Sequence, residues 1–198
     1  MKNNCIILFM KVPKPGFVKT RLAKDIGNEQ ACYIYKQLVE KTVQTIMQTG
    51  IDFEIHYIPK NDLKLLESCL GIDLTYFPQN EGDLGEKMNY SMEKVFQKGY
   101  QKVILIGSDI PGLTKNILIN AFASICKNPV LGPTHDGGYY LIGSHKDHHH
   151  SSFFNEIQWS TSSVLDQTVS QMAKKGYSPY FMSVLNDIDT INDLFLLK

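Results

Sequence analysis

The sequence lacks an excess of charge of either sign. Its 198 residues include 20 Lys and Arg against 20 Asp and Glu, so the formal net charge is zero. A neutral chain has no general electrostatic attraction for the phosphates of a nucleic acid or for an anionic membrane surface. We therefore expect neither a nucleic acid nor a membrane as a partner.

Long hydrophobic runs and paired-cysteine motifs are also lacking. Without a membrane-length segment or a signal-peptide pattern, we expect a cytoplasmic protein. The cysteines are scattered without CxxC spacing, which favours free buried thiols over a disulfide framework or a zinc site. They are Cys5, Cys32, Cys69 and Cys126. No linker or change of composition divides the chain, so residues 1–198 are predicted to form a single domain of unassigned oligomeric state.

Two enzyme signatures are absent as well. There is no GxSxG motif, so a Ser–His–Asp hydrolase is not supported. The three adjacent histidines at residues 148–150 cannot all face one way, and no helical i,i+4 partner or nearby cysteine completes a zinc site. An exposed loop is predicted for this run.

What the chain does contain is an alternation of two apolar patterns. Short continuous runs are typical of strands covered on both faces, and apolar residues at three- and four-residue intervals are typical of amphipathic helices. Strands are expected at Cys5–Met10, Phe53–Ile58, Leu74–Phe77, Lys102–Ile106, Pro129–Leu131, Tyr139–Ile142 and Tyr180–Leu185. Helices are expected across Tyr35–Ile46, Asn61–Leu70, Leu84–Val95, Ile117–Ile125, from Ser160 or Thr161 to Lys175, and Asp189–Leu196.

This alternation predicts an α/β fold with a mostly parallel sheet, helices on both faces, and an antiparallel addition near the double glycine at Gly137. Ligands of such open sheets bind beyond the carboxyl ends of the strands. The loops after Met10, Phe77, Ile106 and Leu131 are therefore the places where a functional site is expected.

The first of these loops, KVPKPGFVKTRL, is rich in cations. Lys11, Lys14, Lys19 and Arg21 lie between a strand and a helix, with Gly16 shaping the backbone. Such a loop suits a polyphosphate, because a helix N-terminus adds backbone donors and a positive dipole end. It is not a Walker A loop, since the glycine required before the lysine is absent. The alternative is a solvated basic loop.

An acid closes the buried strand in the stretch LIGSDIPGL. A carboxylate at this position, Asp109 beside Ser108, suits Mg²⁺, which prefers one or two carboxylates together with substrate phosphates. The alternative is a helix cap, but Thr114 is better placed to cap a helix that begins near Lys115. Asp109 is thus the first candidate metal ligand.

Three other short motifs contribute candidates. In GDLGEKM, Gly82 and Asp83 form either a nucleotide contact or a capped turn. In THDGG, a structural turn is the default interpretation of Asp136, Gly137 and Gly138. In NDIDT, Asp187 and Asp189 face the same side if the chain is extended, which suits a second metal ligand; a cap role for Asp189 is an equal alternative.

The ordered motifs KVPKPGFVKTRL, GDLGEKM, LIGSDIPGL, LGPTHDGGYYLIG, WSTSSVL and NDIDT resemble those of a bacterial family of glycosyltransferase-A-like proteins. Its members are described as nucleotide-diphospho-sugar transferase-like or as arsenosugar-biosynthesis glycosyltransferases. KTRL and DGG also resemble loops of phospholactate guanylyltransferase. The resemblance implies a nucleotide-binding, Rossmann-like GT-A sheet in which Asp109 corresponds to the metal-binding acid of a DxD motif, although SDIP holds one acid.

Two reactions fit these residues. In glycosyl transfer, Mg²⁺ or Mn²⁺ on Asp109 would stabilise the diphosphate of a nucleotide-sugar donor, and Asp136 would orient or deprotonate a hydroxyl of a small-molecule acceptor. In nucleotidyl transfer, the cationic loop would hold the pyrophosphate that leaves a nucleoside triphosphate. The resemblance favours the first reaction and the cation density favours the second. A third alternative is a nucleotide-binding module without catalysis.

Overall fold

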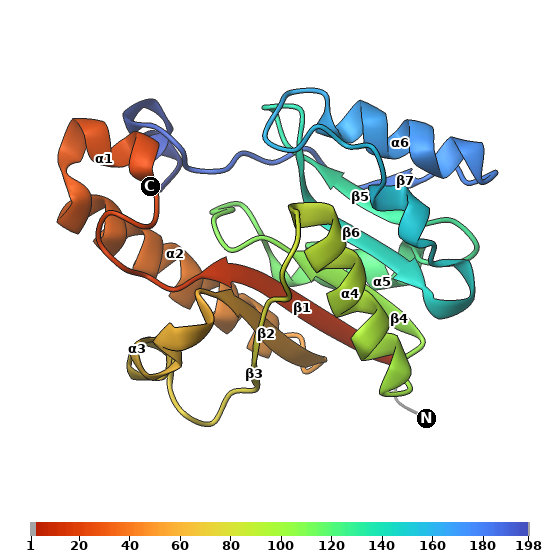
Figure 1. Cartoon of the computed structure of the whole chain (residues 1–198), viewed down its shortest axis with the longest axis horizontal. Helices are drawn as coiled ribbons and strands as arrows, with labels where there is room; N and C mark the ends of the chain where they lie inside the picture. Colours follow the sequence, from red (N-terminus) through yellow and green to blue (C-terminus); the bar gives the residue numbers. More distant parts are fainter. Residues whose placement is uncertain (1–2, 198) are drawn as a thin grey trace.

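The computed structural model describes residues 3–197, which form a seven-stranded sheet in the order β3-β2-β1-β4-β6-β5-β7 (Figure 1). Strand β6 pairs antiparallel with both β4 and β5, and the other neighbouring strands are parallel. The predicted mostly parallel sheet with an antiparallel addition is therefore confirmed. The strands are β1 (Asn4–Lys11), β2 (Asp52–Ile58), β3 (Tyr76–Pro78), β4 (Lys102–Ile106), β5 (Val130–Pro133), β6 (Tyr139–His145) and β7 (Tyr180–Phe181).

Helices cover both faces of this sheet, as the alternation of patterns predicts (Figure 1). The α-helices are α1 (Thr20–Ile26), α2 (Asn28–Met47), α3 (Leu63–Leu70), α4 (Leu84–Gln97), α5 (Lys115–Ser124) and α6 (Val164–Lys174). Short 3₁₀ helices are η1 (Lys60–Asp62), η2 (Lys146–His148), η3 (Ser151–Phe154) and η4 (Ile191–Leu197).

The central strand β1 divides the hydrophobic core in two. Ile6 and Leu8 belong to a cluster with side chains of α2, α3 and α5. Cys5 and Ile7, which point to the opposite face, belong to a second cluster with side chains of α4, η3 and α6. All four are fully buried. Because alternate residues of a strand face opposite sides, an unbroken apolar run is what a strand covered on both faces requires.

Helix caps explain several element boundaries. Thr114 accepts a hydrogen bond from the Ile117 N–H at 3.3 Å, so it caps α5 as predicted. Asp83 accepts from the Glu86 N–H at 2.9 Å, and the Glu86 carboxylate accepts from the Asp83 N–H at 2.8 Å. This reciprocal pair is a capping box, which satisfies two backbone donors at the start of α4.

Other boundary predictions are wrong. Helix α6 begins at Val164, because the Thr161 hydroxyl bonds back to the Gln158 carbonyl at 2.7 Å and so stabilises a turn. Asn61, where a helix was expected to begin, lies inside η1, and α3 begins at Leu63. Helix α1 was not expected; it is separated from α2 by Gly27, which has a φ of 85°.

The C-terminal segment also differs from expectation. Strand β7 covers two residues, and Leu185 forms an isolated bridge with Thr134. Beyond it, Asp193 accepts hydrogen bonds from the backbone N–H groups of Asp189 and Thr190 at 3.0 and 2.7 Å. Asp193 thus provides the cap that was one alternative for Asp189, and the Asp189 carboxylate makes ion pairs instead.

Two side-chain environments were predicted wrongly. Cys5 and Cys32 are buried, but Cys69 is half-buried and Cys126 is exposed. The histidine run is not a freely exposed loop, because the His149 ring bonds Ser144 Oγ at 3.0 Å and Asn89 Oδ1 at 3.0 Å. Packing against α4 therefore draws this ring inward.

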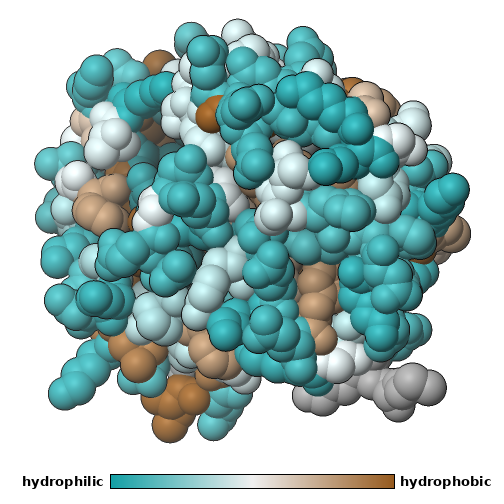
Figure 2. Space-filling view, turned by 45° about the vertical axis from the view of Figure 1, so that its right-hand side comes forward, coloured by the Kyte–Doolittle hydropathy of each residue, from teal (hydrophilic) through white to brown (hydrophobic). Residues whose placement is uncertain are grey.

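The surface is mixed in character. On the face shown in Figure 2, hydrophilic residues predominate and hydrophobic ones are scattered in small groups. Among the described residues, no helix combines the length and the apolarity needed to cross a bilayer.

Candidate functional site

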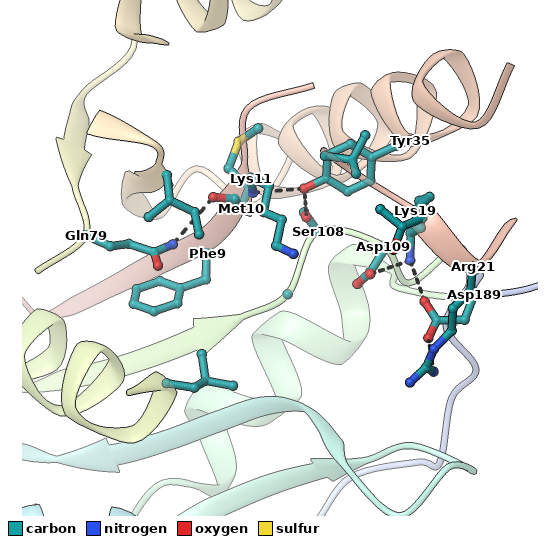
Figure 3. A pocket seen from close by; sticks show the side chains of 15 residues that line it. Phe9, Met10, Lys11, Lys19, Arg21, Tyr35, Gln79, Ser108, Asp109 and Asp189 are labelled. Carbon is teal, nitrogen blue, oxygen red and sulfur yellow. Dashed lines mark hydrogen bonds and ion pairs between the residues drawn. The ribbon is translucent and has the colours of Figure 1, made fainter. Parts of the chain in front are cut away.

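A cavity of about 420 Å³ opens where β1 and β4 end (Figure 3). These two strands are neighbours in the sheet, and β1 is followed by β2 on its other side. The order of strands therefore reverses at this point, which is where open α/β sheets bind ligands. The volume is in the range of small-molecule sites.

A chain of ion pairs crosses one end of this cavity (Figure 3). Lys19 Nζ lies 2.7 Å from Asp109 Oδ2 and 3.1 Å from Asp189 Oδ1. Arg21 Nη1 lies 3.0 Å from Asp189 Oδ2. Three segments far apart in the sequence meet here: the loop after β1, the loop after β4, and the segment before η4.

Lys19 is the most constrained member of this chain. Its side chain is 5% exposed, and its backbone adopts the left-handed conformation with φ 48° and ψ 44°. Burial alone would lower the pKa of Lys19, but the charges of Asp109 and Asp189 raise the pKa above its ordinary value. The ammonium is therefore charged at neutral pH. A non-glycine residue in this conformation is typical of sites where geometry is imposed for function.

Tyr35 ties the two strand ends together. Its hydroxyl accepts a hydrogen bond from the Lys11 N–H at 3.0 Å and lies 2.9 Å from Ser108 Oγ. Tyr35 and Ser108 are each 4% exposed. Burial and the nearby charge of Asp109 raise the pKa of Tyr35 to about 12, so it remains a neutral donor. This contact fixes the spacing of the loops after β1 and β4.

Acidic groups outnumber basic ones around the ion pairs. Burial, and then the charges of Asp189, Asp109 and Asp136, raise the pKa of Asp187 to about 6. The charges of three carboxylates thus act on Asp187, while Lys19 and Arg21 supply the basic charge next to Asp189. A divalent cation or another positive group would relieve this excess of negative charge.

The donor set fits such a cation only in part. Within residues 3–197, no three His, Cys, Asp or Glu side chains are grouped to hold a metal ion. Asp109 Oδ2 and both oxygens of Asp189 are engaged by Lys19 and Arg21. Mg²⁺ needs only one or two carboxylates when substrate phosphates complete its shell. Asp109 and Asp189 are the two candidate carboxylates that line this cavity, and Asp187 is not among its lining residues.

The opposite end of the cavity is less polar. Phe9 lines it and is 8% exposed. Gln79 Nε2 donates to the carbonyl oxygens of His56 and Met10, at 2.9 and 3.4 Å. These bonds fix the amide so that its oxygen is the group left to accept from a ligand. The cavity therefore has an apolar end with one amide and a charged end.

The cationic loop is divided by the fold. Lys11, Lys19 and Arg21 line the cavity. Lys14 does not, and its ammonium pairs with Asp62 at 3.3 Å. Gly16, with a φ of 77°, packs against Asn28. The charge available to a bound polyphosphate is therefore smaller than the sequence suggests.

The other predicted residues fall into two groups. Asp83 caps α4 in the capping box and Gly82 precedes it, and neither residue lines this cavity. Asp136 and Gly138 line a second cavity of about 460 Å³, which shares Leu84, Arg21 and Asp189 with the first. Gly137 lies beside that second cavity, packed against Ser162.

A buried series of polar residues resembles a hydrolase triad but is closed to substrate. His56 Nδ1 lies 2.9 Å from Ser91 Oγ, and His56 Nε2 lies 3.2 Å from Glu54 Oε2. Ser91 is 1% exposed, so no substrate reaches its hydroxyl. The hydrogen bonds among these three side chains therefore have a structural role.

Sequence reasoning missed four residues that shape the two cavities. Tyr35 was assigned to an apolar helix face, and nothing marked Gln79 or Phe9. Trp159 belongs to the motif WSTSSVL, which carried no assigned role. The one signal for Tyr35 in the sequence is its hydroxyl, which is a polar group on an otherwise apolar helix face. Such a group can reach a polar strand end such as Ser108 and Asp109.

Comparisons with known proteins agree with this architecture. The model of the family described as "Uncharacterized protein conserved in bacteria (DUF2064)" matches residues 42–161. A crystal structure of a protein from Desulfovibrio desulfuricans G20, described as a nucleotide-diphospho-sugar transferase, is 33% identical with a TM-score of 0.92. The match covers 98% of this chain and 87% of that one. No curated protein matches the sequence.

More distant structures share the fold alone. A nucleotidyl transferase from Methanothermobacter thermautotrophicus is 11% identical with a TM-score of 0.63, over 98% of this chain and 95% of that one. Rv0371c from Mycobacterium tuberculosis H37Rv, in complex with manganese, is 14% identical with a TM-score of 0.53, over 99% and 97% of the two chains.

Proposed function

We propose that this chain, which belongs to the bacterial DUF2064 family, is a transferase that takes its transferred group from a nucleotide donor. The reaction we favour is glycosyl transfer from a nucleotide-diphospho-sugar to a small acceptor. The observation that carries the proposal is the buried Lys19 ammonium between Asp109 and Asp189, in a cavity at the reversal point of the sheet. The relative from Desulfovibrio desulfuricans supports the choice of donor.

The polarity of the cavity suggests how the donor lies in it. The base would rest at the end formed by Phe9 and Gln79, where an amide oxygen accepts from an exocyclic amino group. The diphosphate would lie at the charged end, near Lys11 and Arg21. Positive groups there stabilise the negative charge that develops on the leaving nucleoside diphosphate.

A divalent metal is part of the proposal. Asp109, with Asp187 or Asp189, would hold Mg²⁺ or Mn²⁺, and the manganese complex of Rv0371c supports this choice. When bound, the metal supplies charge neutralisation of the diphosphate. Lys19 would orient Asp109 and Asp189, and it would offset their mutual repulsion before the donor arrives.

Nucleotidyl transfer is the second candidate, favoured by the three cations that line one cavity. It is weakened by Lys14, which pairs with Asp62 outside that lining. A nucleoside triphosphate carries more negative charge than a nucleotide-diphospho-sugar. It would therefore need more cations in the cavity, and Lys14 is not one of them. The two reactions release different products and are separable by assay.

Thermal unfolding with Mn²⁺ and a panel of nucleotide sugars and nucleoside triphosphates tests the proposal. A ligand at a hundred times its Kd stabilises the native state by about 2.7 kcal/mol. Turnover of the stabilising ligands is then followed by release of nucleoside diphosphate or of pyrophosphate. Release of a nucleoside diphosphate supports glycosyl transfer, and release of pyrophosphate supports nucleotidyl transfer. Nucleotide binding without either product identifies a binding module.

The matched variants are Asp109→Asn and Asp62→Asn. Both remove one carboxylate that pairs with a lysine of the same loop, but only Asp109 lines the cavity. We expect Asp109→Asn to lose turnover and Asp62→Asn to keep it. Full turnover in Asp109→Asn would contradict the assignment.

A further inference from the structure

The second cavity, of about 460 Å³, adjoins the proposed donor site. Arg21, Leu84 and Asp189 line both cavities, so the two cavities share part of their walls. The proposed function gives the first cavity a donor and leaves the second without a role.

Three sequence motifs combine to form this second cavity. Gly85 of α4 has no side chain, and a Cβ there would lie 2.6 Å from Cζ2 of Trp159. Gly137 packs against the backbone of Ser162, and its carbonyl accepts from the Leu165 N–H at 2.9 Å. The glycines of GDLG and THDGG are therefore required because the WSTSS segment approaches both loops closely. The packing fixes Trp159 in the cavity wall.

The polar groups of this wall suit hydroxyls. Asp136 Oδ1 accepts from Thr134 Oγ1 at 2.5 Å and from the Gly138 N–H at 3.1 Å. These bonds hold the carboxylate in place, and Oδ2 is left to accept from a ligand. The Ser160 hydroxyl adds a donor on a backbone with a φ of 65°, a conformation that non-glycine residues rarely adopt.

The charge of the wall argues against an anionic ligand. Arg21 is the one cation among the described residues that line this cavity, and it already pairs with Asp189. Asp136 and Asp189 lie in the same wall. A phosphate or carboxylate group here would face like charges without an unpaired cation to offset them. A neutral ligand meets no such penalty.

We infer that the second cavity binds the acceptor, and that the acceptor is a neutral polyhydroxylated molecule, of the chemistry of a sugar or polyol. Its hydroxyl is held by Asp136 Oδ2, and its apolar face packs on the indole of Trp159. The inference rests on the proposed function, because it assumes a donor in the first cavity.

The transfer forms one bond at the anomeric carbon of the donor sugar and breaks another. The acceptor oxygen bonds to the anomeric carbon of the donor sugar, and the bond from that carbon to the diphosphate oxygen breaks. The electron pair of the broken bond stays on the nucleoside diphosphate, and the hydroxyl proton passes to Asp136.

Trp159 is the only tryptophan of the chain, so its fluorescence reports directly on this cavity. The full-length protein is titrated with glucose, ribose and glycerol, and in parallel with glucose 6-phosphate, ribose 5-phosphate and glycerol 3-phosphate. We expect at least one neutral compound to change the emission saturably, with an affinity about tenfold or more above that of its phosphate ester. A stronger response to the phosphate esters, or no response to any of the six, overturns the inference.

Two variants complete the test by steady-state kinetics with the responding compound. Trp159→Phe and Asp136→Asn should raise the acceptor KM or lower kcat by about tenfold or more, with the donor KM unchanged. Asp166→Asn, which removes an exposed acid from α6, is the control and should match the wild type. An increase confined to the donor KM contradicts the assignment.

Nucleotide binding, measured by thermal unfolding on the same samples, keeps the two claims distinguishable. Stabilisation by a nucleotide without a tryptophan response to sugars overturns the acceptor inference alone. Absence of nucleotide stabilisation overturns the proposed function, whatever the tryptophan reports.

Discussion

Lys19 Nζ lies 2.7 Å from Asp109 Oδ2, so a buried ammonium joins the loop after β1 to the loop after β4. The same ammonium reaches Asp189 at 3.1 Å. Lys19 therefore lies between two carboxylates where the sequence predicts a divalent cation. A metal that binds both acids has to displace this ammonium or coordinate the oxygens that it leaves free.

The first prediction concerns that competition. Lys19→Met leaves Asp109 without its ion-pair partner and leaves Asp189 paired with Arg21 alone, and we expect the unfolding free energy to fall by about 1–3 kcal/mol, since both acids are partly solvated. Mn²⁺ should stabilise this variant more than the wild type, because the ammonium no longer occupies Asp109 Oδ2 and Asp189 Oδ1. Thermal unfolding with and without Mn²⁺ measures both effects.

Lys14→Met is the control for Lys19→Met. Lys14 is in the same loop and also pairs with an aspartate, but it is 53% exposed and lies outside the cavity lining. We expect wild-type stability and a wild-type response to Mn²⁺. Equal Mn²⁺ responses in the two variants would show that Lys19 does not compete with the metal.

The second prediction concerns Tyr35. Tyr35→Phe removes the hydroxyl that accepts from the Lys11 N–H and contacts Ser108, and it leaves the partly buried N–H and the buried Ser108 hydroxyl without that partner. We expect a loss of about 1–3 kcal/mol in unfolding free energy and weaker donor binding. Urea denaturation and ligand-dependent thermal shifts provide the measurement.

Tyr33→Phe is the matched control for Tyr35→Phe. Tyr33 is on the same helix but is 58% exposed. Its loss of a hydroxyl should leave stability and binding unchanged. If Tyr35→Phe behaves like Tyr33→Phe, the strand ends do not depend on this contact.

The sequence predicts the framework of the site because its signals are local. An apolar run that ends in Ser108 and Asp109 identifies a buried strand with an acid at its carboxyl end. Thr114 identifies the next helix start. Both inferences need only neighbouring residues.

The contacts within the site are not local, and for that reason the sequence does not reveal them. Lys19 and Asp109 are 90 positions apart, and Lys19 and Asp189 are 170 apart. The left-handed conformation of Lys19 gives no residue-type signal, because glycine is the residue that usually marks it. Whether Lys14 or Lys19 turns inward depends on where Asp62 and Asp109 lie in the folded chain.

The third prediction concerns the buried polar series beneath α4. Lys98 Nζ lies 2.6 Å from Glu54 Oε1, and His56 bonds the other Glu54 oxygen. Burial alone would raise the pKa of Glu54, but hydrogen bonds from His56 and Lys98 hold the pKa below its ordinary value. Glu54→Gln should therefore destabilise the protein by about 1–3 kcal/mol, measured by urea denaturation.

Glu81→Gln provides the comparison for Glu54→Gln. Glu81 also faces a lysine, Lys60, at 3.7 Å, but its side chain is 91% exposed. An ion pair in solvent contributes little, so we expect no measurable change. If the two substitutions change the unfolding free energy by similar amounts, burial does not strengthen the contacts of Glu54 with His56 and Lys98.

The fourth prediction concerns the pH dependence of stability. Burial, with a smaller effect from the neighbouring His150, lowers the pKa of His149 from 6.5 to about 4. The unfolded chain therefore binds a proton more readily than the folded protein between these values. This histidine adds stability that is fully present above pH 6.5 and is lost as pH falls to about 4, by up to about 3 kcal/mol.

His149→Gln should remove this contribution, so the variant's unfolding free energy falls less steeply than that of the wild type between pH 6.5 and 4. Urea denaturation across this range measures both slopes. His135→Gln is the control, because His135 is exposed on a turn and its removal leaves the interior intact. Parallel curves for His149→Gln and the wild type would contradict the prediction, because the acid sensitivity would then come from other groups.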